Sequence, residues 1–319
     1  MTALRLAAVI DIGASAMRLV VAEPGPRGGW KQIDRAVKPV SLGRDVFRSG
    51  RISRETSLRA IGILVGFGEL LAGWGIAPGD AHVIATSAVR EARNRAAFVG
   101  RVFSRAALRI HVLDEIEENR LTCLAVRHAV GGLRSACSLI IEAGAGTTRI
   151  SVLRGKEITG AYSFRFGALR MGKYLDPDWG DYTHLERDIG RMVGAKLDTE
   201  SPAGGFSRAS RFAAVGSPVR IAAEKAGTKT KENYALISRK NFLDFVAGIQ
   251  GCSADECVRM LHITYYEAEG LVPSLIICKY FFERTSAREI LVPHVSIREG
   301  VLLGFTPEGG AAAGAGKKP

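Results

Sequence analysis

Cysteine is scarce in this sequence and follows no recognisable pattern: five residues stand at positions 123, 137, 252, 257 and 278. Cys252 and Cys257 lie five apart, without the second pair or the nearby histidines that a zinc site needs. The spacing does not suggest a paired disulfide framework either. The cysteines therefore argue against a structural metal and indicate a reducing compartment.

Long hydrophobic runs are absent as well. No apolar run approaches the roughly 20 residues that a bilayer span needs. The opening, MTALRLAAVIDIG, has the short apolar stretch of a signal peptide, but that stretch ends at Asp11 and no cleavage-like sequence precedes the next strand. We interpret it as the first β-strand of a cytoplasmic protein and expect no membrane partner.

Aromatic residues are also few, at 7%, whereas hydrophobic residues make up 47% of the 319 residues. This composition is typical of an α/β protein built on Ala, Val, Ile, Leu and Gly. The length predicts two domains of roughly 100 to 200 residues each. Lys and Arg exceed Asp and Glu by 44 − 32 = +12. This excess indicates a polyanionic partner such as nucleic acid, a phosphate chain or a nucleotide, or else reflects general solubility.

Two stretches of the chain share one plan. VIDIGASAMRLVVAE begins at Val9, and LIIEAGAGTTRISVLRG begins at Leu139. Each has a hydrophobic strand, an acid, a glycine-containing turn and a second strand. Asp11 and Glu142 are the corresponding acids, and 142 − 11 sets the copies 131 residues apart. The spacing predicts an internal duplication of about one domain.

Both copies return directly as a strand, whereas a Walker loop or a dinucleotide-binding fingerprint would enter a helix. We therefore expect two hairpins. The tip of such a hairpin can aim consecutive backbone N–H groups at a phosphate, and its carboxylate can hold Mg²⁺ through water. The alternative is that the glycines only permit a tight turn.

Two strand-to-helix junctions between these copies carry reactive residue types. Thr86, Ser87 and Arg90 follow the strand HVIA. Their hydroxyls and guanidinium, together with the N–H groups of the helix start, could bind an anion. The alternative is that Thr86 and Ser87 only cap the helix. The next junction, LDEIEENRL, carries four acids. One of these carboxylates, if it faces bound phosphate, could accept a proton from the attacking water. The alternative is that the acids only form a solvated helix start, where the helix dipole favours negative charge.

The ordered segments DIGASAMRL, ATSAVREARNR, EENRL, EAGAGTTRI, FRFGALRM and VGSPVR resemble the exopolyphosphatase and guanosine pentaphosphate phosphatase (Ppx/GppA) family, over about residues 7 to 305. That family belongs to the actin, sugar kinase and Hsp70 superfamily. The resemblance implies Glu118 as the general base, with Glu117 as the alternative if the register slips. It implies Asp11 and Glu142 as ligands of a Mg²⁺ cofactor. The implied phosphate-binding residues are Gly13, Ser15, Arg18, Ser87, Arg90, Asn94, Gly144, Gly146, Thr147 and Thr148.

The chain departs from the family pattern in three places. Ala14 and Ala16 replace polar residues of the first motif, which removes groups that contact phosphate. Glu142 replaces an Asp, and its extra methylene displaces the carboxylate. Pro218 stands where the family has a Gly-Gly turn, and proline has no N–H to donate.

We therefore expect an α/β protein with two ribonuclease-H-like domains of the actin-like superfamily, flanking a cleft. The expected domains are 1–125 and 126–305, with a terminal helix crossing back to the first and a disordered tail at 306–319. The expected function is Mg²⁺-dependent release of terminal phosphate from inorganic polyphosphate or guanosine pentaphosphate.

Two other functions stay open. The altered motifs allow a protein that binds polyphosphate or an alarmone without turnover. A kinase of the superfamily would need an adenosine-binding Gly-Gly turn near position 216, and Pro218 argues against it. The expected partner is a phosphate polymer or guanosine polyphosphate and not a specific nucleic acid, and the resemblance implies a homodimer.

Overall fold

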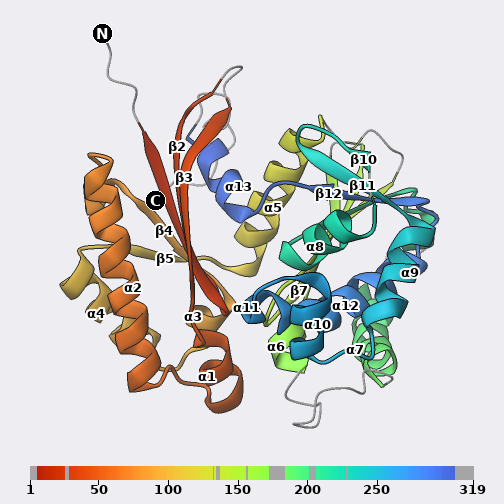
Figure 1. Cartoon of the computed structure of the whole chain (residues 1–319), viewed down its shortest axis with the longest axis horizontal. Helices are drawn as coiled ribbons and strands as arrows, with labels where there is room; N and C mark the ends of the chain where they lie inside the picture. Colours follow the sequence, from red (N-terminus) through yellow and green to blue (C-terminus); the bar gives the residue numbers. More distant parts are fainter. Residues whose placement is uncertain are drawn as a thin grey trace. The chain divides into compact units, whose positions relative to one another are not determined.

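The computed structural model describes residues 6–25, 29–131, 133, 137–155, 157–171, 184–200, 206–227 and 229–305, with only the backbone described for 195–200. The expected disordered tail, 306–319, lies outside these residues. The chain divides into two units (Figure 1): the described part of Met1–Ala125 with that of Ile297–Pro319, and the described part of Val126–Ser296. Residues 297–305, which carry the expected terminal helix, group with the first unit, whereas the expected bounds of the second domain, 126–305, include them.

The first unit is built on a five-stranded sheet of order β3-β2-β1-β4-β5. Strand β1 pairs antiparallel with β2 and parallel with β4, and β4 pairs parallel with β5. The sheet therefore has three antiparallel strands, β3, β2 and β1, followed by β4 and β5, which run parallel to β1. Its strands are β1 (Ala7–Ile12), β2 (Ala16–Pro24), β3 (Trp30–Pro39), β4 (His82–Ala85) and β5 (Ile110–Val112).

Burial differs between the centre and the edge of this sheet. Five of the six residues of β1 are buried, as expected for a strand covered on both faces, which is why its sequence is an almost continuous apolar run. The edge strand β3 is largely exposed and carries Lys31, Arg35 and Lys38. Charges on an edge strand discourage pairing with other chains.

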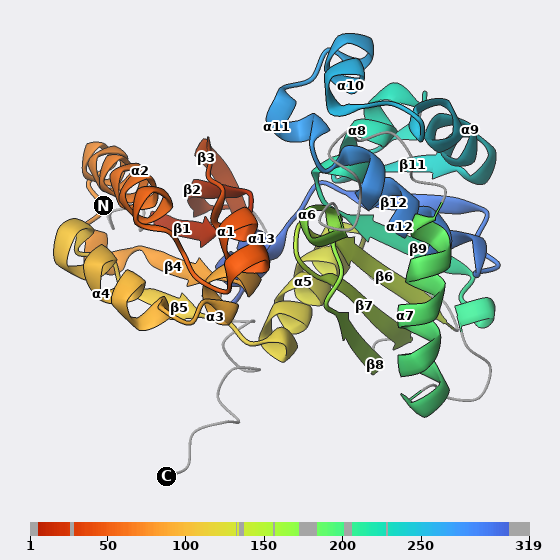
Figure 2. The same cartoon turned by 90° about the horizontal axis from the view of Figure 1, so that it is seen from below.

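Helices cover both faces of the first sheet. Helices α2 and α4 lie on one side and α13 on the other, as Figures 1 and 2 show. Ile297, Val301 and Leu302 of α13 join a core cluster with Val9 and Ile84 of the sheet. The helices of this unit are α1 (Leu42–Ser49), α2 (Arg54–Gly73), α3 (Ser87–Glu91), α4 (Arg95–Ala106), α5 (Glu115–Ala129, which reaches past the unit boundary) and α13 (Ile297–Leu303), with a 3₁₀ turn at Pro78–Asp80.

Helix α2 is the one described helix long and apolar enough to cross a membrane by length and composition. Its buried residues recur at spacings of three and four, the pattern of a helix that packs by one face. The helix begins after Ser53, whose hydroxyl accepts a hydrogen bond from Thr56 N at 3.1 Å. The buried face packs against β2 and α4.

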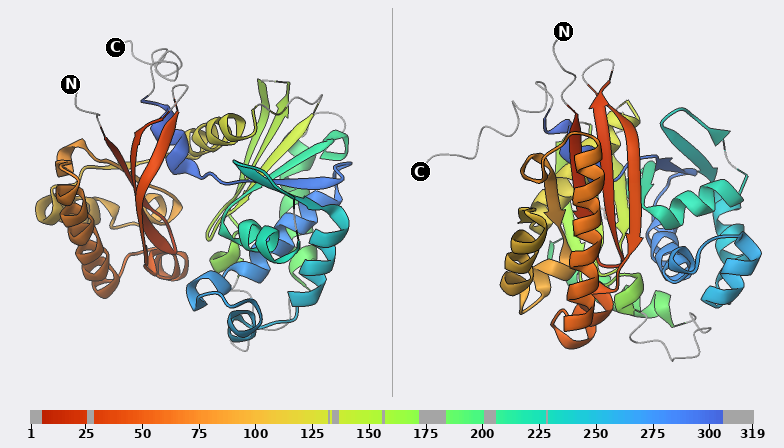
Figure 3. Two further views of the ribbon diagram at one scale, coloured as in Figure 1. Left: turned by 45° about the horizontal axis from the view of Figure 1, so that its top comes forward. Right: turned by 60° about the vertical axis from the view of Figure 1, so that its left-hand side comes forward.

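The second unit has a seven-stranded sheet of order β10-β11-β12-β9-β6-β7-β8. Five of these strands, β8-β7-β6-β9-β12, repeat the pattern of β3-β2-β1-β4-β5 in the first unit, including the antiparallel hairpin and the parallel neighbours. Figure 3 gives two views of both sheets. The strands are β6 (Ser138–Ala143), β7 (Thr148–Arg154), β8 (Glu157–Phe164), β9 (Arg211–Val215), β10 (Lys229–Thr230), β11 (Tyr234–Ser238) and β12 (Glu289–Pro293).

The core of the second unit is organised by α12, which is buried around most of its circumference. Phe281 and Phe282 on this helix contact aromatic rings of the sheet at tilted angles: Phe281 contacts Phe164, and Phe282 lies 5.0 Å from Phe212 between ring centroids. The helices are α6 (Ala168–Met171), α7 (Leu185–Glu200), α8 (Ser217–Lys225), α9 (Arg239–Ile249), α10 (Ala254–Leu261), α11 (Tyr265–Ala268) and α12 (Leu271–Glu283), with a 3₁₀ turn at Phe206–Arg208.

The repeated strand order confirms the predicted fold class, an α/β protein made of two ribonuclease-H-like units. Both predicted hairpins form: β1 with β2, and β6 with β7. Asp11 faces Arg18 in the first, and Glu142 faces Arg149 in the second. Since 18 − 11 and 149 − 142 are equal, the two copies have the same register.

Candidate functional site

Polar side chains of the first unit gather where its parallel strands end. Asp11 lies near the end of β1 and pairs in register with Ile84 of β4. Ser87 begins the helix that follows β4, and Leu113 directly follows β5. Because the carboxyl ends of parallel strands meet at one edge of a sheet, this edge is where an α/β protein holds its ligand.

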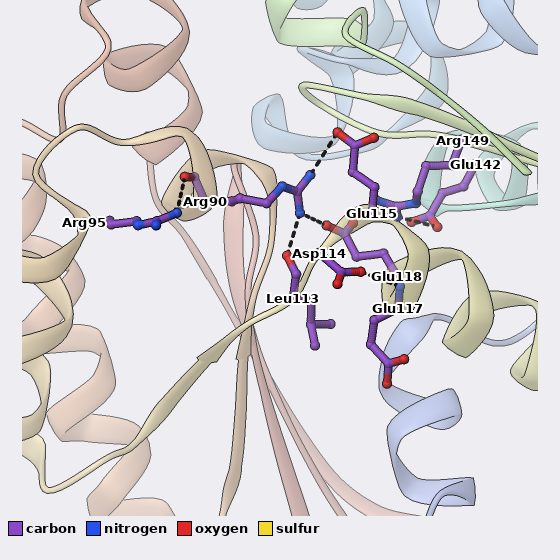
Figure 4. A network of polar contacts seen from close by, with 9 residues as sticks. All are labelled: Arg90, Arg95, Leu113, Asp114, Glu115, Glu117, Glu118, Glu142 and Arg149. Atoms are coloured by element: carbon purple, nitrogen blue, oxygen red, sulfur yellow. Dashed lines mark hydrogen bonds and ion pairs between the residues drawn. The ribbon is translucent and has the colours of Figure 1, made fainter. Parts of the chain in front are cut away.

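Arg90 and Glu118 form the central contact of this edge (Figure 4). One guanidinium nitrogen of Arg90, Nη1, donates to the carbonyl oxygen of Leu113 at 2.8 Å and also to Oε1 of Glu118. The other terminal nitrogen, Nη2, lies 3.7 Å from Oε1 of Glu115. The Glu118 side chain is 0% exposed and that of Arg90 17%. A buried carboxylate is thus joined to α3 and to the end of β5 by one arginine.

Glu117, the alternative base, lies in different surroundings. Both of its carboxylate oxygens accept hydrogen bonds from Arg120 at 2.8 Å, and its side chain is 38% exposed. The hydrogen bonds from Arg120 lower the pKa of Glu117, against a smaller opposing effect of partial burial. Its backbone N–H donates to Asp114 Oδ1 at 2.8 Å, the bond that an N-cap residue makes at a helix start.

The tip of the first hairpin presents unpaired N–H groups. Gly13 N donates to Ala16 O at 3.1 Å and so closes the turn. The carbonyl of Ala14 accepts from Gly43 N at 2.7 Å, and that of Ser15 from Val40 N at 3.0 Å. Within the described residues, the amides of Ala14 and Ser15 donate to no protein atom. Because the carbonyls of Ala14 and Ser15 already accept hydrogen bonds and their amides have no protein acceptor, the tip resembles a backbone anion-binding site.

The second hairpin tip is held in the same way. Gly144 N donates to Thr147 O at 2.9 Å, and the carbonyl of Gly144 accepts from Ala168 N at 3.0 Å. The carbonyl of Gly146 accepts from Arg170 Nε at 2.8 Å. In the described part of the chain, the amides of Ala145 and Gly146 have no protein acceptor. The two tips therefore share a construction as well as a sequence plan.

Two glycines that sequence reasoning gave no role make these tips possible. A Cβ on Gly167 would lie 2.4 Å from the carbonyl oxygen of Gly144, and one on Gly43 would lie 2.9 Å from the Cβ of Ala14. Each glycine stands at the start of the helix that ties down a tip, α6 or α1. The available signal was their matching place, a glycine at the helix start that lies 43 − 13 = 30 residues after the first glycine of one tip and 167 − 144 = 23 residues after that of the other.

Each hairpin also carries an acid and an arginine. Arg18 Nη1 lies 3.9 Å from Asp11 Oδ2, which is too long for a hydrogen bond. Arg149 Nη2 lies 2.7 Å from Glu142 Oε2. The additional methylene of Glu142 accounts for the closer contact, since the paired positions have the same register in both hairpins.

These carboxylates differ in how well they fit a cation. Among the described residues no cluster of three or more His, Cys, Asp or Glu could hold a metal. A cation would therefore need phosphate oxygens and water as further ligands, which is how Mg²⁺ usually binds in phosphate sites. Asp11 and Glu142 each offer carboxylate oxygens to such a site, and one oxygen of Glu142 is engaged by Arg149.

Two residues predicted to bind phosphate have side chains that make hydrogen bonds within the protein. The amide of Asn94 accepts from Ile52 N at 3.0 Å and donates to Ile52 O at 2.8 Å. The hydroxyl of Thr148 donates to the carbonyl of Phe166 at 2.9 Å. Thr147 and Ser87 are buried, at 3% and 5% exposure.

Pro218 lies in the first turn of α8, after Gly216. Gly216 has φ of 129°, a conformation that L side chains rarely adopt. A proline in the first turn is tolerated because the N–H groups there have no intrahelical acceptor. Strand β9 is thus followed by a sharp, glycine-dependent turn that offers fewer donors than the expected Gly-Gly pair.

Comparisons with known proteins agree with this architecture. The Exopolyphosphatase 1 of Mycobacterium leprae is 23% identical over 92% of this chain and 88% of its own length. The Exopolyphosphatase 2 of Mycobacterium tuberculosis is 32% identical over 53% of this chain and 54% of its own length. The crystal structure of an exopolyphosphatase from Cytophaga hutchinsonii has 19% identity and a TM-score of 0.82, covering 94% of this chain and 97% of that one.

The structure of the Aquifex aeolicus member of the Ppx/GppA family has 18% identity and a TM-score of 0.74, covering 94% of this chain and 97% of that one. At such identities these structures support the fold alone. The model of the Ppx/GppA phosphatase family matches residues 20–308 of the chain. The chain therefore belongs to the Ppx/GppA phosphatase family.

Proposed function

We propose that this protein is a Mg²⁺-dependent phosphohydrolase that releases terminal phosphate from inorganic polyphosphate or guanosine pentaphosphate. The single observation that carries the proposal is the buried pair of Arg90 and Glu118 at the carboxyl edge of the first sheet. A nearby guanidinium favours the ionised form of a carboxylate, which is the form that a general base requires.

In the proposed reaction, Glu118 accepts a proton from a water molecule as the water oxygen bonds to the terminal phosphorus. The bond between that phosphorus and the bridging oxygen breaks, and its electron pair stays with the shortened chain. Arg90 offsets charge on the phosphoryl group. Catalysis by a positioned base typically contributes about 10² to 10⁴ in rate.

The hairpin tips bind phosphate in this proposal. The support is their backbone: two successive amides at each tip have no acceptor among the described residues, and the carbonyls are held by other amides or by Arg170. Such preorganised donors stabilise charge without reorganising during the reaction. Arg18, beside the first tip, adds a positive charge at that end of β2.

Asp11 is the residue we propose to hold Mg²⁺, and Glu142 is the second candidate. Bound Mg²⁺ would neutralise phosphate charge and orient the phosphoryl group. The hydrogen bond that Arg149 donates to one oxygen of Glu142 competes with that role in the second hairpin.

A second candidate function is binding of polyphosphate or an alarmone without turnover. The observation that favours it is the engagement of Glu142 by Arg149 at 2.7 Å, together with the missing donor at Pro218. Both features weaken the metal and phosphate contacts that turnover needs. They leave the amides of the tips available for binding.

The test is release of inorganic phosphate from long-chain polyphosphate and, separately, from guanosine pentaphosphate, with Mg²⁺ and with EDTA. Mg²⁺-dependent release from either compound supports the hydrolase and names its substrate. Tight binding of both compounds without release supports the binding protein and rejects the hydrolase. Light scattering on the same sample reports whether the expected homodimer forms.

A further inference from the structure

The first unit carries a groove beside α2 and α4 that the proposed reaction does not use. Its volume is about 1140 Å³. The groove lies outside the edge of the sheet where Asp11, Arg90 and Glu118 gather, and none of these three lines it. The lining residues that carry the inference are Arg54, Leu58, Gly62, Val65, Arg101 and Arg105.

The charge at this groove has one sign. Arg51, Arg54, Arg101 and Arg105 line it, and its lining includes no Asp or Glu. All four arginines are exposed, and within the described residues their guanidinium groups have neither an ion pair nor a hydrogen bond. Arginine presents a planar fork of donors that matches carboxylate and phosphate groups. The rim is therefore suited to several anionic groups at once.

The floor of the groove is apolar. Leu58 is 62% exposed although it is a large hydrophobic residue, and Val65 is half-buried. A Cβ added to Gly62 would meet no atom within 4 Å, so the backbone of α2 is open to a close approach. Positions 54, 58, 62 and 65 lie on one side of the helix and span about 16 Å at 1.5 Å per residue.

We propose that this groove binds an acidic amphipathic helix of a partner protein. Apolar side chains of that helix would lie along Leu58, Gly62 and Val65, and its Asp and Glu side chains would pair with the arginines of the rim. Recognition of a helix in a groove uses anchors spaced by three and four residues, and the lining of α2 follows that spacing.

Other occupants fit less well. A phosphate chain has no apolar part to cover the exposed Leu58. Small ligands usually occupy pockets of about 300 to 1,000 Å³ and are enclosed there. This groove is larger and runs along three turns of α2, which is the footprint of a helix.

The test measures binding of a fluorescein-labelled designed peptide to the full chain by fluorescence anisotropy. The peptide has about five helical turns, with leucines at positions i, i+4 and i+7 and glutamates beside them. We expect saturable binding that weakens at least tenfold in the Arg101→Glu, Arg105→Glu double variant. Arg59→Glu on the exposed side of α2, outside the groove lining, is the matched control and should bind as the wild type does.

A second pair of variants separates the groove from general charge. Gly62→Phe fills the groove and should abolish binding, whereas Gly68→Phe, also placed where a Cβ meets no atom, should not. A peptide with lysine for glutamate, and one with serine for leucine, should not bind. Phosphate release by the Arg101→Glu, Arg105→Glu variant should equal that of the wild type, so the proposal stands apart from the proposed function.

Three results would overturn the proposal. One is absence of binding by the acidic peptide. Another is displacement of the bound peptide by inorganic polyphosphate or by dodecyl phosphate, together with unchanged peptide binding by Gly62→Phe. That result would assign the arginines to phosphate alone. The third is a concentration-dependent dimer of the wild type that Gly62→Phe dissociates, which would assign the groove to a second copy of the chain.

Discussion

The guanidinium of Arg90 bridges the carbonyl oxygen of Leu113 and the carboxylate of Glu118. These groups come from the helix after β4, the end of β5 and the first turns of α5. The side chain that we propose as the base is therefore fixed by elements that are distant in the sequence. One nitrogen of that arginine, Nη1, donates to both acceptors.

Replacing Arg90 by lysine keeps the charge but removes the planar fork. We expect kcat/KM for polyphosphate to fall at least tenfold, because a hydrogen bond to a charged group contributes about 1.5 to 3 kcal/mol and 1.36 kcal/mol is a tenfold change. Arg95→Lys is the matched control, since among the described residues the guanidinium of Arg95 donates one hydrogen bond, to the carbonyl oxygen of Arg90 at 3.1 Å. Equal rates for both variants would argue against a role of the fork.

Gly300→Ala should disturb the helix that carries Glu118. A Cβ at this position would lie 2.1 Å from the carbonyl oxygen of Leu121, so α13 and α5 must separate. We expect a loss of about 1 to 3 kcal/mol in the free energy of unfolding, as for overpacking of a core. Gly100→Ala in α4, where a Cβ meets no atom within 4 Å, should not destabilise the protein. Urea denaturation of the two variants compares them, and similar stabilities would contradict the contact.

Asn94→Ala distinguishes a structural side chain from a phosphate ligand. Removing the amide leaves two backbone groups of Ile52 without their partner, so we expect a loss of about 1 to 3 kcal/mol in stability. The KM for polyphosphate should stay close to the wild-type value at a temperature where the variant is folded. A large rise in KM without a change in stability would restore the phosphate role predicted from the sequence.

The ion pair of Glu117 and Arg120 should contribute to stability only above acidic pH. The hydrogen bonds from Arg120 lower the pKa of Glu117 below its ordinary value of 4.5. A lowered pKa means that the contribution is fully present above the ordinary value and is lost as the pH falls through the lowered one. We expect Glu117→Gln to cost about 0.3 to 0.5 kcal/mol at about pH 7. The difference should be smaller at about pH 3, which lies below the ordinary value and toward the lowered one.

Urea denaturation at both pH values measures this difference, and a difference independent of pH would show that the pair is not its source. In the ion pair of Lys240 and Asp244, on exposed side chains of α9, the hydrogen bond to Asp244 raises the pKa of the lysine, whereas the bond from Arg120 lowers the pKa of Glu117.

The hairpins could be predicted from the sequence because their signals are local. An apolar run, an acid, a small-residue turn and a second apolar run are enough to predict β1 with β2 and β6 with β7. The opposition of Asp11 to Arg18 then follows from the length of the turn. The two-unit fold follows from the repeated plan.

Other parts of the site depend on contacts between distant residues. Gly43 and Gly167 are required because each lies against a hairpin tip many residues earlier. Glu117 and Glu118 are neighbours in one acidic run, and only packing buries one of them against Arg90 and leaves the other to Arg120. The structural bonds of Asn94 to Ile52 likewise join residues 42 apart.

The most direct test compares phosphate release from long-chain polyphosphate with Mg²⁺ by the wild type, Glu118→Gln and Glu117→Gln at equal concentrations of folded protein. We expect the rate to fall by a factor of about 10² to 10⁴ in Glu118→Gln, the usual contribution of a general base, and to stay nearly unchanged in Glu117→Gln. Retention of the wild-type rate by Glu118→Gln, or an equal loss in both variants, would contradict this expectation.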